Sequence, residues 1–204
     1  MSVSYKTAAA FAVIWGAFSL ASAANAQEST YTQLNEETCE SLYIHEEGSS
    51  TQIGSRCAGQ DGWWLYRQAD DHGEWTAYSQ GDAMPEDLQY GGYTGNFGNY
   101  HTVVEWRRDD AGQAFATIHR YYSMDFGSGE PVRQSVLVVT ALRPDGEPES
   151  CHVGYVMASQ IEDANVQARL MADEMAPHID CEGHRPFRID AEIPSVYQLI
   201  SLQH

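Results

Sequence analysis

The stretch RQSVLVVTALRPDGEPESCHVGYVMASQ, residues 133–160, contains the only long apolar run outside the first residues of the chain. Residues 136–142 are almost continuously hydrophobic and rich in β-branched side chains, which is typical of a strand covered on both faces. Four turn-forming residues then interrupt the run: Pro144, Asp145, Gly146 and Pro148. A second strand is expected at residues 151–157. The stretch therefore predicts two buried strands joined by a turn.

A helix is predicted directly after these strands, over residues 164–175. Its apolar residues recur at four-three-four spacing and so form one stripe that faces the core, namely Ala164, Ala168, Met171, Ala172 and Met175. Asp163 is in position to cap the first turn, and Pro177 is expected to end the helix. We therefore expect an α+β fold, a mostly antiparallel β-sheet packed by one C-terminal helix and stapled by disulfides.

The start of the chain has the parts of a secretory signal peptide. Lys6 supplies a positive charge, residues 8–20 form an apolar run, and small residues lead to a cleavage site after Ala26. The apolar run is too short to span a membrane, which needs about 20 consecutive apolar residues. We therefore expect residues 1–26 to be a signal peptide and residues 27–204 to form a single secreted domain. It would have no transmembrane segment and would lie in the periplasm or outside the cell.

The expected mature chain is strongly acidic and contains no lysine. Removing Lys6 leaves ten arginines against 29 carboxylates, a formal charge of −19. This charge repels the phosphates of nucleic acid, so no nucleic-acid partner is expected. The lack of lysine excludes Schiff-base chemistry and a lysine-containing phosphate loop in the mature chain. High solubility is the simplest consequence of the acidity, and a surface for a cationic partner is the alternative.

Four cysteines in an exported chain predict two disulfides, for which three pairings exist. We predict Cys39 with Cys57 and Cys151 with Cys181, because each pair brackets a local supersecondary unit. The cysteines have no C-x-x-C spacing, and no two histidines are four residues apart on the predicted helix. No metal and no cofactor is therefore expected.

The N-terminal half is predicted to consist mainly of short strands. Residues 27–38 are polar and indicate an extended lead-in with little to bury. A hairpin is expected at residues 39–57, followed by strands at residues 63–66 and 74–79.

The segment GGYTGNFGNY, residues 91–100, interleaves glycines with aromatic residues. Glycines permit close approach of the backbone, and Tyr93, Phe97 and Tyr100 are of a type that stacks on ligands. One interpretation is a ligand-binding loop that uses Tyr93 and Phe97. The other is a loop whose aromatic side chains fill the edge of the core, which is the more common arrangement.

A further hairpin is predicted from residues 101–108 and 113–122, with Arg108 opposite Gln113. Alternation of side chains then places Glu105, Arg107 and Arg120 on one face of the hairpin. Such a group can be a structural network of cross-strand ion pairs, or it can line a substrate pocket. His119 lies on the other face, where a hydrogen-bonded structural role is expected.

The blocks VEWRR, FATIHR, VLVVTAL and CHVGYV, with the helix and the closing Cys181, span residues 104–181. In their spacing this part of the chain resembles small exported proteins of Gram-negative bacteria whose function is uncharacterised. The resemblance implies an exported α+β domain. It implies no activity and therefore no catalytic residue.

Two functions follow from these features. The first is an exported, non-catalytic binding module that recognises a protein or an envelope component, for example an inhibitor of a secreted hydrolase. No catalytic motif is recognised in the sequence, and the acidity would steer the chain toward a basic enzyme such as a lysozyme. The second is a small secreted hydrolase with Glu105 or His119 as general base and Arg107 or Arg120 as a clamp on the substrate.

Overall fold

The computed structural model describes residues 27–35, 37, 39–47, 50–91, 97–125 and 132–202. These residues form two β-sheets, one of six strands and one of five. The six-stranded sheet has the order β1-β7-β8-β9-β10-β11, with antiparallel pairing throughout except between β10 and β11. Its strands are β1 (Glu28–Gln33), β7 (Gly98–Arg108), β8 (Ala114–Asp125), β9 (Val132–Leu142), β10 (Ser150–Val156) and β11 (Phe187–Ile189).

The five-stranded sheet is a meander with the order β2-β3-β4-β5-β6. Every neighbouring pair in it is antiparallel. Its strands are β2 (Cys39–Glu47), β3 (Ser50–Ala58), β4 (Trp64–Ala69), β5 (Glu74–Ser79) and β6 (Gln89–Tyr90). The disulfide between Cys39 and Cys57 joins β2 to β3 at the base of their hairpin, which confirms this predicted pairing.

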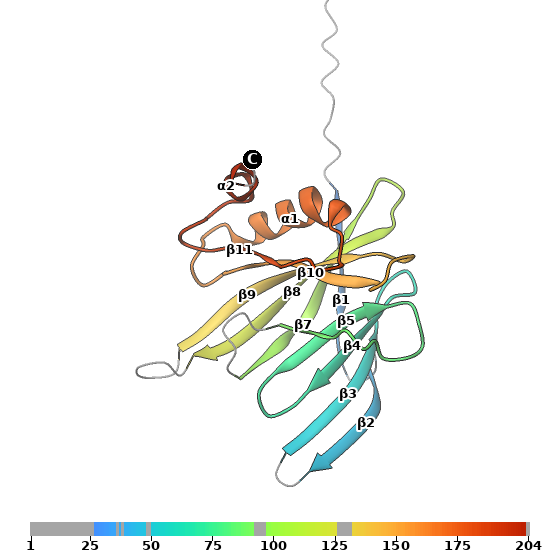
Figure 1. The fold of residues 1–204 in the computed structure, drawn as a ribbon. Helices are drawn as coiled ribbons and strands as arrows, with labels where there is room; N and C mark the ends of the chain where they lie inside the picture. Colours follow the sequence, from blue (N-terminus) through green and yellow to red (C-terminus); the bar gives the residue numbers. More distant parts are fainter. Residues whose placement is uncertain are drawn as a thin grey trace, which may run out of the picture.

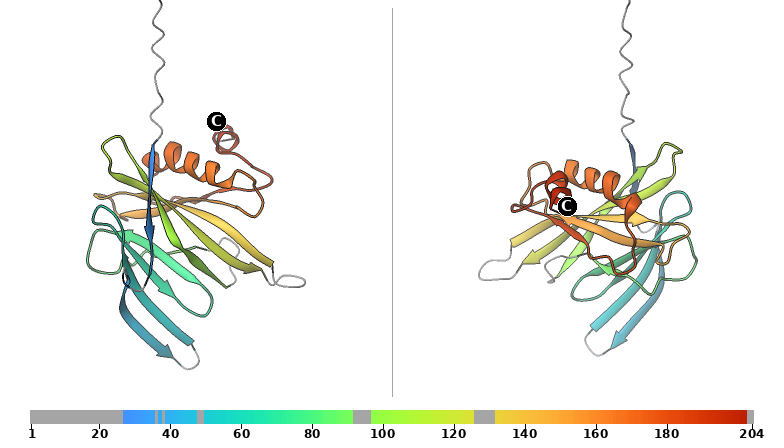
Figure 2. Two further views of the ribbon diagram at one scale, coloured as in Figure 1. Left: turned by 180° about the vertical axis from the view of Figure 1, so that it is seen from behind. Right: turned by 45° about the horizontal axis from the view of Figure 1, so that its top comes forward.

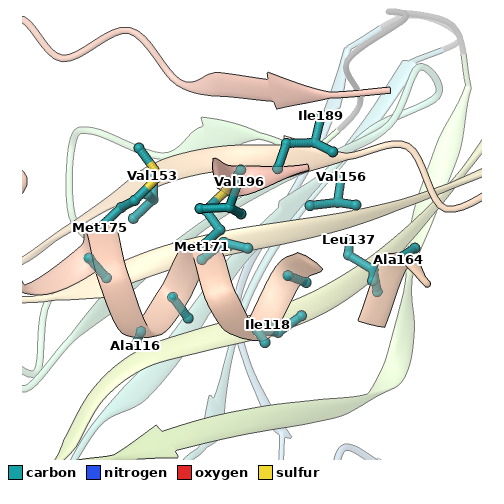
Figure 3. Packing of buried hydrophobic residues seen from close by; sticks show 14 of the residues in the cluster. Ala116, Ile118, Leu137, Val153, Val156, Ala164, Met171, Met175, Ile189 and Val196 are labelled. Carbon is teal, nitrogen blue, oxygen red and sulfur yellow. The ribbon is translucent and has the colours of Figure 1, made fainter. Parts of the chain in front are cut away.

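The molecule has three layers, with the helix α1 (Ala164–Met175) on one face of the six-stranded sheet and the five-stranded sheet on the other (Figures 1 and 2). The predicted apolar stripe of α1 is buried and faces the central strands. Met171 and Met175 pack against Ile118 and Val153 in the largest core cluster (Figure 3). At Gly154 a side chain would meet the sulfur of Met171 at 2.8 Å, so this glycine permits the close approach of α1 to the sheet.

The space between the two sheets is filled mainly by aromatic and aliphatic side chains. Trp106 of β7 lies edge-on to Tyr78 of β5, with ring centroids 5.6 Å apart. Leu65 and Val104 are fully buried beside them. Residues 136–142 are buried on both faces, as the sequence predicted, because Leu137 and Val139 pack in the cluster under α1, whereas Val136 and Val138 pack with Tyr100 and Tyr121.

The predicted helix is confirmed at residues 164–175, with one difference at its start. Asp163 precedes the first turn, yet its side chain makes no capping hydrogen bond and instead accepts one from Gln167 at 2.8 Å. Pro177 lies in a 3-10 turn that ends the helix. The second predicted disulfide, Cys151 with Cys181, is also confirmed.

A short helix, α2 (Val196–Ser201), packs on the same core through Val196 and Leu199.

Two expectations about the strands were wrong. Residues 28–33 of the expected lead-in form β1, which pairs with β7 along its whole length. In the β7–β8 hairpin Tyr100 lies opposite Tyr121, but Arg108 pairs with Ala114 instead of Gln113. The register shifts at this end of β7 and again after Tyr100. Such irregularities insert extra residues into one strand, and alternation in the sequence does not reveal them.

The expected signal peptide, residues 1–26, lies outside the described residues. Within the described part of the chain, no helix is long and apolar enough to cross a membrane.

Candidate functional site

Glu105 and Arg107 of β7 both point toward α1, because residues two apart on a strand share a face. Arg107 donates to both carboxylate oxygens of Asp173, from Nε at 2.8 Å and from Nη2 at 2.7 Å. Its side chain is only 5% exposed and that of Asp173 is 21% exposed. This bidentate ion pair fastens α1 to β7.

Glu105 makes the second ion pair between β7 and α1. Its Oε1 accepts from Arg169 Nε at 2.6 Å and from the Ser29 hydroxyl at 2.5 Å. The hydrogen bond to Glu105 raises the pKa of the Arg169 guanidinium above its usual value. Ser29 of β1 also accepts a hydrogen bond from Arg107. We refer to Ser29, Glu105, Arg107, Arg169 and Asp173 as the helix–sheet network.

Arg120 of β8 lies on this face too, as the sequence predicted, but outside the network. It donates to Ser135 at 2.5 Å and to Asn165 at 3.1 Å. The predicted cross-strand ion pairs are absent among the described residues, since Glu105 and Arg107 find their partners on α1.

Two cavities adjoin the helix–sheet network. One of about 470 Å³ is lined by Tyr31, Arg107, Arg169 and Asp173 among others. The other, of about 240 Å³, is lined by Glu105 and Arg120, and Tyr31 borders both. The charged groups of the network therefore border cavities, although most of their hydrogen bonds are made to other groups of the protein.

The two aromatic candidates are not part of this face. Tyr93 lies outside the described residues. Phe97 precedes β7 at the end opposite Arg107, is 46% exposed, and stacks on His72 with ring centroids 5.8 Å apart. Its φ of 42° is unusual for a bulky residue. The structure therefore does not bring Phe97 together with Glu105, Arg107 and Arg120.

His119 points to the opposite side of the six-stranded sheet from Glu105. It is 1% exposed, stacks on Tyr100, and its Nε2 lies 2.6 Å from the carbonyl oxygen of His101. Burial lowers the pKa of His119 to about 3, so the ring is neutral at neutral pH. His152, also buried, has its pKa lowered to about 3 for the same reason. The position of His119 fits the structural role that the sequence indicated.

A larger hollow lies elsewhere, where the loop after β5 meets the turn between β9 and β10. Gln80 N in the loop donates to Glu149 Oε2 of the turn at 3.0 Å, and beside it Tyr78 N of β5 donates to Ser150 Oγ of β10 at 2.8 Å. The resulting groove has a volume of about 600 Å³. We call it the acidic groove, and its carboxylate lining is Glu86, Asp87, Glu147 and Glu149.

None of the described residues that line the acidic groove is basic. The ion pairs of the described residues include none made by Glu86, Asp87 or Glu147. Met84, Pro85 and Pro148 add apolar surface beside these carboxylates. The arrangement therefore combines uncompensated negative charge with apolar walls, which suits the side chain of a lysine or arginine.

Sequence reasoning missed the acidic groove because its two halves are far apart in the chain. The carboxylates at residues 86–87 and 147–149 each resemble an ordinary solvated turn. Only the excess of 29 carboxylates over 11 basic residues pointed to a negative surface.

Comparisons with known proteins returned nothing: no family model, no curated protein and no solved structure matches this chain. Functional inference therefore depends on the geometry and the charges alone.

Proposed function

We propose that this chain is an exported, non-catalytic binding module that captures a positively charged protein at the acidic groove. The observation that carries the proposal is the groove itself, about 600 Å³ in volume, whose lining within the described part of the chain has four carboxylates and no basic residue. The whole chain has a formal charge of −18, so its electrostatic potential is negative beyond the groove as well. This potential would speed the association with a basic partner.

The groove is suited to a side chain that is both long and cationic. The methylene stem of a lysine or arginine packs on apolar surface such as Met84 and Pro85, while its charged end reaches a carboxylate. Glu86 and Asp87 are exposed and adjacent in sequence, so they would meet the partner first. An inhibitor of a basic secreted hydrolase, such as a muramidase, works in this way if its acidic surface covers the catalytic cleft.

The proposal is tested with the purified protein, its disulfides intact, against a panel of basic muramidases at low and at moderate salt. We expect stoichiometric binding and inhibition of at least one enzyme, with weaker affinity at moderate salt because ions screen the attraction. Capture from an envelope extract of the source cells, followed by mass spectrometry, extends the test to other cationic partners. The proposal fails if no basic protein binds in either experiment at low salt.

A matched pair of variants distinguishes binding at the groove from attraction by the net charge of the protein. The groove variant carries Glu86→Gln, Asp87→Asn and Glu147→Gln. The control variant carries Asp71→Asn, Asp110→Asn and Glu162→Gln, three exposed carboxylates that do not line the groove. Both variants lose three negative charges. We expect the groove variant to bind at least about 30-fold more weakly and the control less than about threefold. Equal losses would mean that only net charge matters.

A hydrolase centred on Glu105 is the second candidate, supported by the cavity of about 240 Å³ that this carboxylate and Arg120 line. Glu105 would be the general base and Arg107 or Arg120 the clamp, after release of the ion pair with Arg169. The test is turnover of chromogenic ester, phosphate and glycoside substrates by the wild type and by Glu105→Gln. Turnover that the substitution abolishes would support this candidate; no turnover, or equal turnover, removes it.

A further inference from the structure

Strand β2 is the longest of the strands at the edges of the two sheets. It has nine residues, whereas the other edge strands β1, β6 and β11 have six, two and three. Figures 1 and 2 show the β2–β3 hairpin projecting away from α1 at the end of the five-stranded sheet. An edge strand presents main-chain N–H and C=O groups that another strand can bind.

The projecting hairpin also exposes apolar side chains along this edge. Ile44 is 60% exposed and lies directly opposite Ile53, which is 42% exposed. Leu42 lies beside them at the point where the register between β2 and β3 shifts. Single exposed apolar residues are ordinary, but three on one hairpin at a sheet edge form a patch suited to a partner strand.

The hairpin is held in shape without any partner. The disulfide Cys39–Cys57 fixes its base. On the face opposite Ile44, Tyr43 lies over Gly54 and donates a hydrogen bond to Gln68 at 2.9 Å. A side chain at Gly54 would collide with the Tyr43 ring, so the glycine is required for this contact. A preformed edge reduces the entropy lost on binding.

The charge of β2 selects the partner. Glu46 follows Ile44 on the same face and is exposed. Glu40 is also on β2, paired with Arg56. A second copy of this chain would bring these carboxylates together and would add the repulsion between two strongly acidic molecules. A basic strand would instead be attracted.

We propose that β2 is a strand-addition site for an extended segment of a partner protein that carries apolar residues and a neighbouring basic residue on one face, at alternate positions of the strand. The added strand would extend the five-stranded sheet beyond β2. Its apolar residues would cover Ile44 and Leu42, and a basic residue would reach Glu46. This surface is separate from the acidic groove, which lies between the loop after β5 and the β9–β10 turn.

The test uses a capped nine-residue peptide with lysine at position 2, valine at positions 4 and 6 and threonine elsewhere, so that the lysine and the valines share one face of the strand. The salt concentration is about 150 mM, where screening limits unspecific attraction. Fluorescence anisotropy measures its affinity, and hydrogen exchange locates it. We expect slower exchange of the β2 amides and loss of binding by at least about tenfold in Ile44→Lys. Val132→Lys is the matched control, since Val132 is a strand residue that is 59% exposed, and it should bind as the wild type does. A peptide methylated on its backbone nitrogens should not bind.

Three results would overturn this proposal. Equal affinities of Ile44→Lys and Val132→Lys would mean that the peptide binds elsewhere. Binding that survives backbone methylation would exclude strand addition. A concentration-dependent dimer in sedimentation equilibrium that Ile44→Lys abolishes would assign the edge to a second copy of the chain. The groove variant should bind the peptide normally, so failure here and failure of the groove proposal are distinguishable.

Discussion

The carboxylates of the helix–sheet network and those of the acidic groove have opposite surroundings. In the network Glu105 and Asp173 each face an arginine at 2.6 to 2.8 Å. Among the described residues, no basic residue lines the groove, and Glu86, Asp87 and Glu147 make no ion pair. The network therefore satisfies its charges within the fold, whereas the groove leaves charge for a partner.

This difference predicts which carboxylates affect the stability of the fold and which affect the binding of a partner. Burial of a charge is costly unless the charge is paired. In the network each buried charge has a partner, and these ion pairs join α1 to the sheet. Exposed carboxylates that repel one another contribute nothing to folding. We therefore expect changes in the network to alter the free energy of unfolding, and changes in the groove to alter affinity.

The largest expected change in stability is caused by a decrease in pH, which acts through His119 and His152. Neither histidine belongs to the network or to the groove. Burial lowers the pKa of His119 and of His152 to about 3, whereas the unfolded chain protonates them near the ordinary value of 6.5. Below pH 6.5 the unfolded state binds more protons, so the free energy of unfolding falls as the pH decreases toward 3. At about pH 5 the loss is about 2 kcal/mol for each histidine relative to pH 8.

Urea unfolding of the disulfide-intact protein at several pH values measures this loss. His152→Gln should remove about half of the pH dependence between about pH 8 and pH 5. A free energy of unfolding that stays constant over this range would contradict the assignment of both rings as buried and neutral.

The next effect is expected in the helix–sheet network. Arg107→Met leaves Asp173 without its bidentate partner beside the sheet, and should lower the free energy of unfolding by about 3 kcal/mol. Arg107→Met combined with Asp173→Leu should recover more than half of this loss, because no charge is then left unpaired. Urea unfolding at neutral pH is the measurement. A loss below about 1 kcal/mol in the single variant would mean that the pair is not structural.

The smallest effect on stability is expected in the groove. The groove variant should leave the free energy of unfolding within about 0.5 kcal/mol of the wild type, or raise it slightly, because it removes mutual repulsion and no ion pair. The same urea titration measures it, with the control variant beside it. A loss of more than about 1 kcal/mol would show that these carboxylates have structural partners, and the comparison with the network would fail.

Features encoded locally could be predicted from the sequence. The helix at residues 164–175, both disulfides and the buried strand at residues 136–142 depend on periodicity and on short separations in the chain. The shared face of Glu105, Arg107 and Arg120 followed from alternation along two strands. Each of these features can be recognised within one segment of the chain, without knowledge of the segments that pack against it in space.

Features that depend on pairing between distant segments could not be predicted. Strand β1 is polar, and its structure comes from its hydrogen bonds to β7. The sequence has no pattern that identifies Arg169 and Asp173 of α1 as ion-pair partners of β7. The helix and the strand are far apart in the chain and meet only in the tertiary fold. The acidic groove likewise requires the loop after β5 to meet the β9–β10 turn.

The most direct test of the central claim is site-specific photo-crosslinking to a basic partner found in the muramidase panel or the envelope extract. A photoreactive phenylalanine analogue replaces Asp87 in the groove or Asp110 at the β7–β8 turn, two exposed carboxylates. We expect crosslinks from position 87, located by mass spectrometry next to a lysine or arginine of the partner, and none from position 110. Crosslinks from position 110 without any from position 87 would place the partner elsewhere and contradict the account.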